Sequence, residues 1–219
     1  MRNMKFHLLA AACALAATQA RADDVSFSGF AHGSESVTFT VSAPNVSKTE
    51  AVDAGGFATI VNGGPSFDAY CVDLYQTINF GAAPYTEYTA PGTSHVFENS
   101  RAYSDLSKLY ATAGVVNNAV EEAAFQIAVW EIAYEPTATY SLTSGSATFS
   151  GGTADSSGAL TLATTWLGEL GNNGSGPGIV VRESDLHQDL ISPVPEPETY
   201  ALFMAGLAAV GFMARRRKA

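Results

Sequence analysis

Cysteine is almost absent from this chain of 219 residues, and this scarcity limits its covalent chemistry. The two cysteines are Cys13 and Cys71. We expect Cys13 to be removed with an N-terminal export signal, which leaves Cys71 as the single thiol. One cysteine excludes an internal disulfide, and in an oxidising exterior a lone thiol must pair between chains, react or be protected. The alternative is a buried cysteine that acts as a small apolar side chain.

Positive charge is also scarce. The chain has 11 Lys and Arg against 21 Asp and Glu. Seven of the basic residues lie in the two terminal segments, so residues 23–192 carry a formal net charge of −15. A surface of that charge repels nucleic acid and anionic lipid, which excludes nucleic acid as a partner. It favours cations or basic partners, or it simply keeps an exported domain in solution.

Several common catalytic motifs are missing. The chain has no phosphate-binding glycine loop, no Gly-x-Ser-x-Gly string and no zinc-protease helix motif. The histidines beyond the N-terminal segment, His32, His95 and His187, are far apart and lack the spacing of metal ligands. The sequence therefore predicts neither a metal site nor a cofactor.

Residues 1–22 have the pattern of a secretory signal peptide. Two basic side chains come first, an apolar stretch follows, and Ala20 and Ala22 form the small-x-small pattern that signal peptidase accepts. The mature chain is then expected to begin at Asp23. An alternative interpretation takes Cys13 as the lipidated cysteine of a lipoprotein signal.

The C-terminal segment, residues 193–219, contains three parts in a fixed order. Pro195, Glu196 and Pro197 precede an apolar run over 200–214, which is shorter than the ~20 residues that cross a bilayer comfortably. A basic cluster follows at the end, composed of Arg215, Arg216, Arg217 and Lys218. Such a cluster is expected to stay cytoplasmic.

This tail resembles the PEP-CTERM sorting signal of Gram-negative bacteria that produce exopolysaccharide. The resemblance implies that an exosortase recognises the tail, whose transmembrane helix holds the protein in the inner membrane before sorting. It also implies delivery to the cell surface or the exterior. An ordinary tail anchor is the alternative.

The segment between the two signals, residues 23–192, has the length of one domain with its own core. Its apolar patterns predict the following elements: strands at 37–41, 56–61, 70–80, 179–181 and 186–191, and helices at 100–113, 118–134 and 159–170. We therefore expect an α+β fold, with an antiparallel β-sandwich-like sheet and a helical insertion.

The helix over 118–134 has the clearest boundaries. Asn118 with Glu121 three residues later resembles a capping box, and Pro136 prevents continuation. Its apolar periodicity places Gln126 at the border of the buried stripe, from which its side chain reaches inward.

Cys71 and Gln126 suggest a specific reaction. A thiol held against a glutamine carboxamide can expel ammonia and form an internal thioester, provided that the two groups are oriented and kept dry. The aromatic neighbours Tyr70 and Trp130 suit a dry pocket. Asp73 is expected on the same strand face as Cys71, as a proton acceptor or hydrogen-bond anchor.

Two short strings resemble the thioester domains of bacterial surface adhesins. They are Tyr70-Cys71-Val72-Asp73 and Gln126-Ile127-Ala128-Val129-Trp130-Glu131, with Gln188-Asp189-Leu190 as a further late element. The family commonly has threonine before the glutamine, whereas this chain has Phe125. The resemblance implies a thioester between Cys71 and Gln126, in an environment formed by Tyr70, Asp73, Trp130 and Glu131.

The same resemblance implies a single-use reagent and not an enzyme. The thioester would acylate an amine or hydroxyl on a target surface, which fits adhesion or crosslinking in an extracellular matrix or biofilm. Two alternatives remain open from the residues alone. One is a non-covalent structural or carbohydrate-binding matrix protein, and the other is a cysteine-dependent hydrolase with a histidine partner brought in by folding.

Overall fold

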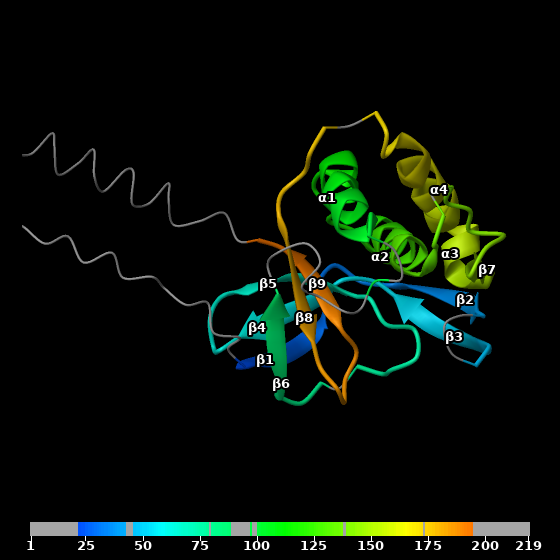
Figure 1. Cartoon of the computed structure of the whole chain (residues 1–219). Coiled ribbons are helices and arrows are strands. Elements are labelled where there is room, and N and C mark those ends of the chain that lie inside the picture. Colours follow the sequence, from blue (N-terminus) through cyan, green and yellow to red (C-terminus); the bar gives the residue numbers. More distant parts are fainter. Residues whose placement is uncertain are drawn as a thin grey trace, which may run out of the picture.

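The structure, a computed structural model, describes residues 22–42, 46–78, 80–88, 97, 100–137, 139–172 and 174–194. Its larger sheet is a closed antiparallel barrel with the strand order β1-β4-β5-β9-β8-β6 (Figure 1). These strands are β1 (Ala22–Phe30), β4 (Phe57–Val61), β5 (Ser66–Cys71), β6 (Ala83–Tyr88), β8 (Ile179–Glu183) and β9 (Leu190–Pro193). Strands from both ends of the described chain complete the barrel.

A second, three-stranded antiparallel sheet has the order β3-β2-β7. It consists of β2 (Glu35–Val41), β3 (Lys48–Ala54) and β7 (Ala147–Ser150). On β2 the side chains of Val37, Phe39 and Val41 are buried, and the residues between them are partly exposed. This alternation follows from the two-residue period of a strand with one covered face.

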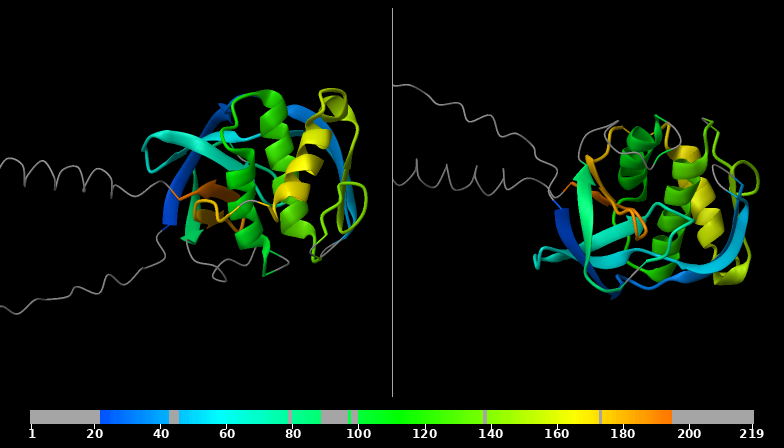
Figure 2. Two further views of the ribbon diagram at one scale, coloured as in Figure 1. Left: turned by 90° about the horizontal axis from the view of Figure 1, so that it is seen from above. Right: turned by 60° about the horizontal axis from the view of Figure 1, so that its bottom comes forward.

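The helices are α1 (Ala102–Ala113), α2 (Ala119–Tyr134), α3 (Gly152–Ser156) and α4 (Ala159–Glu169). Figure 2 shows from two directions that α1, α2 and α4 lie together on one side of the strands. Helix α2 begins where the sequence predicts, because the Asn118 side chain accepts a hydrogen bond from the Glu121 N–H at 3.1 Å. Gly114 ends α1 with a positive φ of 66°, as predicted.

Helix α2 is buried on all sides, so it has no exposed face. Every residue from Glu122 to Tyr134 is buried. The covering elements are α1 and α4, strand β5 of the barrel, and the three-stranded sheet. The predicted position of Gln126 at the border of a stripe is therefore wrong, since its side chain lies inside the core and only 1% of the residue is exposed.

Two further expectations need correction. The larger sheet closes into a barrel and not into a sandwich-like layer, although the α+β class and the antiparallel pairing are as predicted. The predicted strand over 70–80 ends at Cys71, because the backbone beyond it turns away and bonds to loops and side chains. The Val72 N–H donates to the Asp189 carbonyl, and the Leu74 N–H donates to the Tyr134 hydroxyl.

The two terminal signals fall mainly outside the described residues. Ala20, the Pro195-Glu196-Pro197 string and the basic cluster lie there, and Ala22 is the first residue of β1. Within the described part of the chain, no helix is both long enough and apolar enough to cross a bilayer. At the other end, the Val194 N–H still donates to the Gly178 carbonyl beyond the end of β9.

Candidate functional site

Cys71 and Gln126 lie in direct contact, at the point where α2 crosses the end of β5. The Cys71 N–H donates to Gln126 Oε1 at 2.9 Å, and Gln126 Nε2 donates to the Cys71 carbonyl at 2.7 Å. A single carboxamide therefore satisfies both backbone groups of the cysteine. Both residues are buried, as are the atoms that make these bonds.

The local register of the barrel explains why a side chain occupies this position. On β5, Ala69 pairs with Phe57, which is the first residue of β4. Alternate residues of a strand direct their N–H and C=O groups to the same neighbour, so Cys71 faces the side on which β4 has not yet begun. The carboxamide of Gln126 forms the hydrogen bonds that a longer β4 would have formed with Cys71.

Helix α2 makes a series of polar contacts with residues 70–74. Glu122, Gln126 and Tyr134 occur at multiples of four residues on α2, which places them on nearby faces of successive turns. The Glu122 carboxylate accepts from the Tyr70 hydroxyl at 2.9 Å. The Tyr134 hydroxyl bonds both the Leu74 N–H and the Asp73 carboxylate. Helix α2 is thus fixed against residues 70–74 by polar contacts on both sides of Gln126.

A cavity of about 360 Å³ lies next to this pair. Cys71 and Gln126 line it together, and its aromatic lining residues are Phe30, Phe39, Phe57, Phe80 and Trp130. Phe80 is 56% exposed, so the cavity reaches the surface of the molecule. The site is therefore accessible, and its wall is mostly apolar with the charged side chains of Lys48, Glu50 and Asp53 among the lining residues.

The thiol of Cys71 is held in its protonated form. Burial raises its pKa well above the ordinary value, and the nearby carboxylates of Asp73 and Asp189 raise it further. Cys71 therefore lacks the electropositive surroundings that lower the pKa of catalytic thiols. The thiol carries its own proton into any reaction at this site.

Tyr70 and Asp73 are placed differently from the sequence-based expectation. The Tyr70 side chain lies beside Phe125, with ring centroids 4.4 Å apart, and faces a second cavity rather than the one that Cys71 lines. Asp73 is not on a strand face, because β5 ends at Cys71. Its carboxylate instead accepts from the Tyr75 N–H at 2.6 Å and from the Tyr134 hydroxyl. Asp73 thereby anchors the turn that follows the cysteine.

The side chains of Trp130 and Glu131 lie in different places, and only Trp130 is at the cavity. Trp130 lines the cavity with Cys71 and stacks on Phe149. Glu131 points elsewhere and accepts from the Ser141 N–H at 2.7 Å. Burial raises the pKa of Glu131 to about 8, and its second carboxylate oxygen has no partner among the described residues. The structure does not bring Glu131 to the cavity.

The late string Gln188-Asp189-Leu190 does lie at the site. Gln188 lines the cavity and donates to the Asp73 carbonyl. The Asp189 carbonyl accepts from the Val72 N–H, and Leu190 pairs with Cys71 across the β5–β9 ladder. Burial raises the pKa of the Asp189 carboxyl to about 7. This segment holds the backbone on both sides of Cys71.

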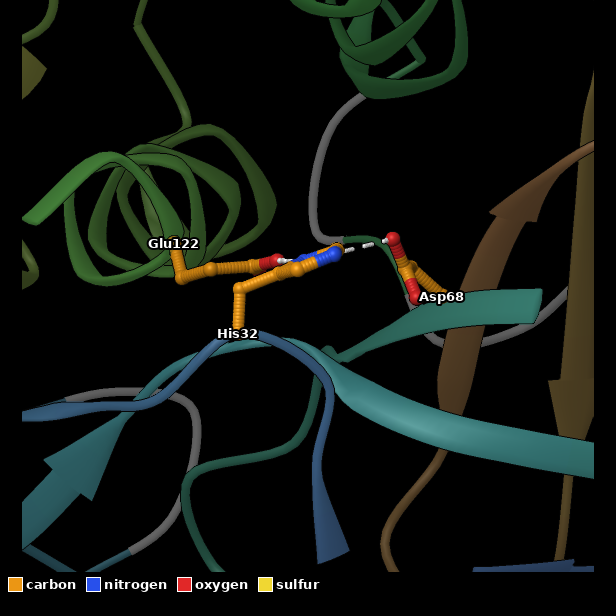
Figure 3. Close-up of side chains that lie close together, drawn as sticks. All are labelled: His32, Asp68 and Glu122. Carbon is orange, nitrogen blue, oxygen red and sulfur yellow. Dashed lines mark hydrogen bonds and ion pairs between the residues drawn. The ribbon is translucent and has the colours of Figure 1, made fainter. Parts of the chain in front are cut away.

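Two features were not found by reasoning from the sequence. Lys48 on β3 lines the cavity, and its ammonium donates to the Leu74 carbonyl at 3.0 Å and lies over the Phe39 ring. The only available signal was that Lys48 is one of four basic residues in 23–192. The other feature is a cluster of His32, Asp68 and Glu122, whose sequence spacing gave no indication of a contact (Figure 3).

Comparison with known proteins identifies the tail and not the domain. Residues 193–218 match the family model described as the PEP-CTERM protein-sorting motif. The motif is that of an exported protein sorted to the cell envelope, with an exosortase as its processing partner. No curated protein and no solved structure matches the chain.

Proposed function

We propose that this exported, exosortase-sorted protein forms an internal thioester between Cys71 and Gln126 and acylates amines or hydroxyls on a target surface. The observation that carries the proposal is the pair of hydrogen bonds that hold the Gln126 carboxamide against Cys71. An amide is a poor electrophile, so attack by a thiol depends on such intramolecular placement.

The first step is thioester formation. Cys71 Sγ attacks the side-chain carbonyl carbon of Gln126, and negative charge develops on Oε1. The Cys71 N–H already donates to that oxygen and would stabilise the charge, as donors do in an oxyanion hole. The thiol proton passes to the amide nitrogen, the C–N bond breaks, and ammonia leaves.

The second step is transfer to the target. An amine or hydroxyl attacks the same carbonyl carbon, the C–S bond breaks, and Cys71 regains its proton. Gln126 is left as a substituted amide or an ester, and no turnover follows. The aromatic side chains of the cavity wall slow the competing attack by water, while the opening near Phe80 admits a target group.

One observation favours a second candidate, a non-covalent matrix protein. Both polar ends of the Gln126 carboxamide are satisfied by backbone groups, which is also what a purely structural glutamine would show. The aromatic cavity with Lys48, Glu50 and Gln76 in its wall has the composition of a carbohydrate site. A cysteine hydrolase is less favoured, since the described residues that line the cavity include no histidine.

The test is intact mass spectrometry of the exported protein produced from the full-length chain, beside its Cys71→Ala variant. We expect the wild-type mass to be lower than calculated by about 17 Da, one ammonia, and methylamine to convert it to an adduct at Gln126. The variant should have its full calculated mass and no adduct. Full wild-type mass with an alkylatable thiol would refute the thioester, and glycan binding by the Cys71→Ala variant would then favour the matrix protein.

A further inference from the structure

Three side chains with metal-binding atoms converge beside the N-terminal end of α2, although they lie far apart in the sequence. His32 comes from the bend after β1, Asp68 from β5 and Glu122 from α2 (Figure 3). His32 Nδ1 is 2.6 Å from Glu122 Oε1 and 3.8 Å from Asp68 Oδ2. All three ligand atoms lie within 4.8 Å of one another.

Glu122 is positioned as metal-binding carboxylates usually are. Its side chain is fully buried, and its Oε2 accepts from the Gly56 N–H at 3.0 Å and from the Tyr70 hydroxyl at 2.9 Å. Residue 56 must be glycine for this approach, because a Cβ there would lie 2.4 Å from Oε2. These outer contacts fix the orientation of the carboxylate and direct Oε1 toward His32.

His32 forms ion pairs with both carboxylates, at 2.6 Å to Glu122 and 3.8 Å to Asp68. One imidazole cannot balance two negative charges, so the cluster keeps an excess of negative charge. With a neutral histidine the cluster carries two negative charges, which one divalent cation would balance. The side chains of His32 and Asp68 are 39% and 40% exposed, so an ion can enter and retain water at its open positions.

We propose that His32, Asp68 and Glu122 bind a divalent transition-metal ion. One imidazole nitrogen with two carboxylate oxygens suits zinc, manganese or ferrous iron, whereas calcium requires six to eight oxygen ligands. Ligand distances of about 2.1 Å place such atoms about 3 to 3.5 Å apart. The contact between His32 and Glu122, 2.6 Å here, would therefore lengthen on binding, and the Asp68 carboxylate would move closer to both. The site is independent of the thioester chemistry, although Glu122 lies one helical turn before Gln126.

The test uses the full-length chain after treatment with a chelator. Isothermal titration calorimetry should show binding of one Zn²⁺ per chain, and thermal scanning should show that Zn²⁺ raises the Tm while Ca²⁺ does not. His32→Ala and Asp68→Asn should each weaken binding at least tenfold. Tyr70→Phe, which removes only an orienting hydroxyl, should weaken it about tenfold. His187→Ala is the matched control, because it removes a histidine outside the cluster and should leave binding unchanged.

Circular dichroism of each variant separates loss of the site from loss of the fold. The proposal is overturned if the folded wild-type protein neither binds Zn²⁺ nor gains Tm. It is equally overturned if Asp68→Asn and His32→Ala bind as tightly as the wild type, or if His187→Ala abolishes binding. In the first case the cluster is an ion pair, and in the others the metal lies elsewhere.

Discussion

The hydrogen bonds of Gln126 allow a quantitative test in which no thioester can form. In a Cys71→Ala background, the further change Gln126→Leu keeps a side chain of similar volume but removes both contacts with residue 71. The N–H and C=O groups of residue 71 are then buried without partners, because β4 begins too late to reach them. A buried unpaired polar group costs about 1–3 kcal/mol, so we expect a loss of about 3 kcal/mol in the free energy of unfolding.

The assay is urea denaturation of the single and double variants, followed by the fluorescence of Trp130 and Trp166. A matched control is Gln76→Leu in the same background. Gln76 lines the same cavity, but its Oε1 has no partner among the described residues, so this change should be close to neutral. A loss below about 1 kcal/mol for Gln126→Leu, or an equal loss for Gln76→Leu, would show that the carboxamide does not bridge residue 71.

The other predictions concern α2 and its surroundings. Asn118→Ala removes the N-cap contact with Glu121 and should cost about 1 kcal/mol in urea denaturation, whereas Asn118→Ser keeps a capping oxygen and should be close to neutral. Gly56→Ala forces a Cβ against Glu122 and should cost about 2 kcal/mol; a neutral result would mean that the two do not meet. The pKa of Glu131 is raised to about 8, so the folded chain holds a proton that the unfolded chain releases near pH 4.5. The free energy of unfolding of the wild type should therefore decrease as the pH rises from 5 to 8, relative to that of Glu131→Gln, by roughly 1.4 kcal/mol per pH unit. If the two variants show the same dependence of stability on pH, the raised pKa of Glu131 is wrong.

Local signals predicted the helices well. Helix α1 ends at Gly114, and α2 lies between Asn118 and Pro136. These residues act through the backbone conformation and hydrogen bonds of their near neighbours, which the sequence alone shows. The short helix expected at 159–170 appears as α4. The contact between Cys71 and Gln126 was also anticipated, from two short strings that resemble those of thioester adhesins, whereas the covalent bond stays a prediction.

The end of β5, the burial of Gln126 and the presence of β3 depend on tertiary contacts, which the sequence did not reveal. The apolar run over 70–80 resembles a strand, but its backbone bonds go to Tyr134 and to the segment around Asp189, which are distant in sequence. Burial of α2 on every side removes the periodicity from which the position of Gln126 was inferred. Strand β3, with four exposed residues in a mixed polar sequence, has no apolar alternation to detect.

The location of β9 determines where tension would run through the molecule. The sorting tail continues the chain directly beyond β9. Strand β9 lies next to β5, and Leu190 is paired with Cys71. Because transfer leaves the partner on Gln126, a pull between the tail and that partner would enter through β9 and leave through α2, which packs against β5. The mechanical strength of such a tether would depend on the hydrogen bonds of β9 with its two neighbours and on the contacts of α2 with β5.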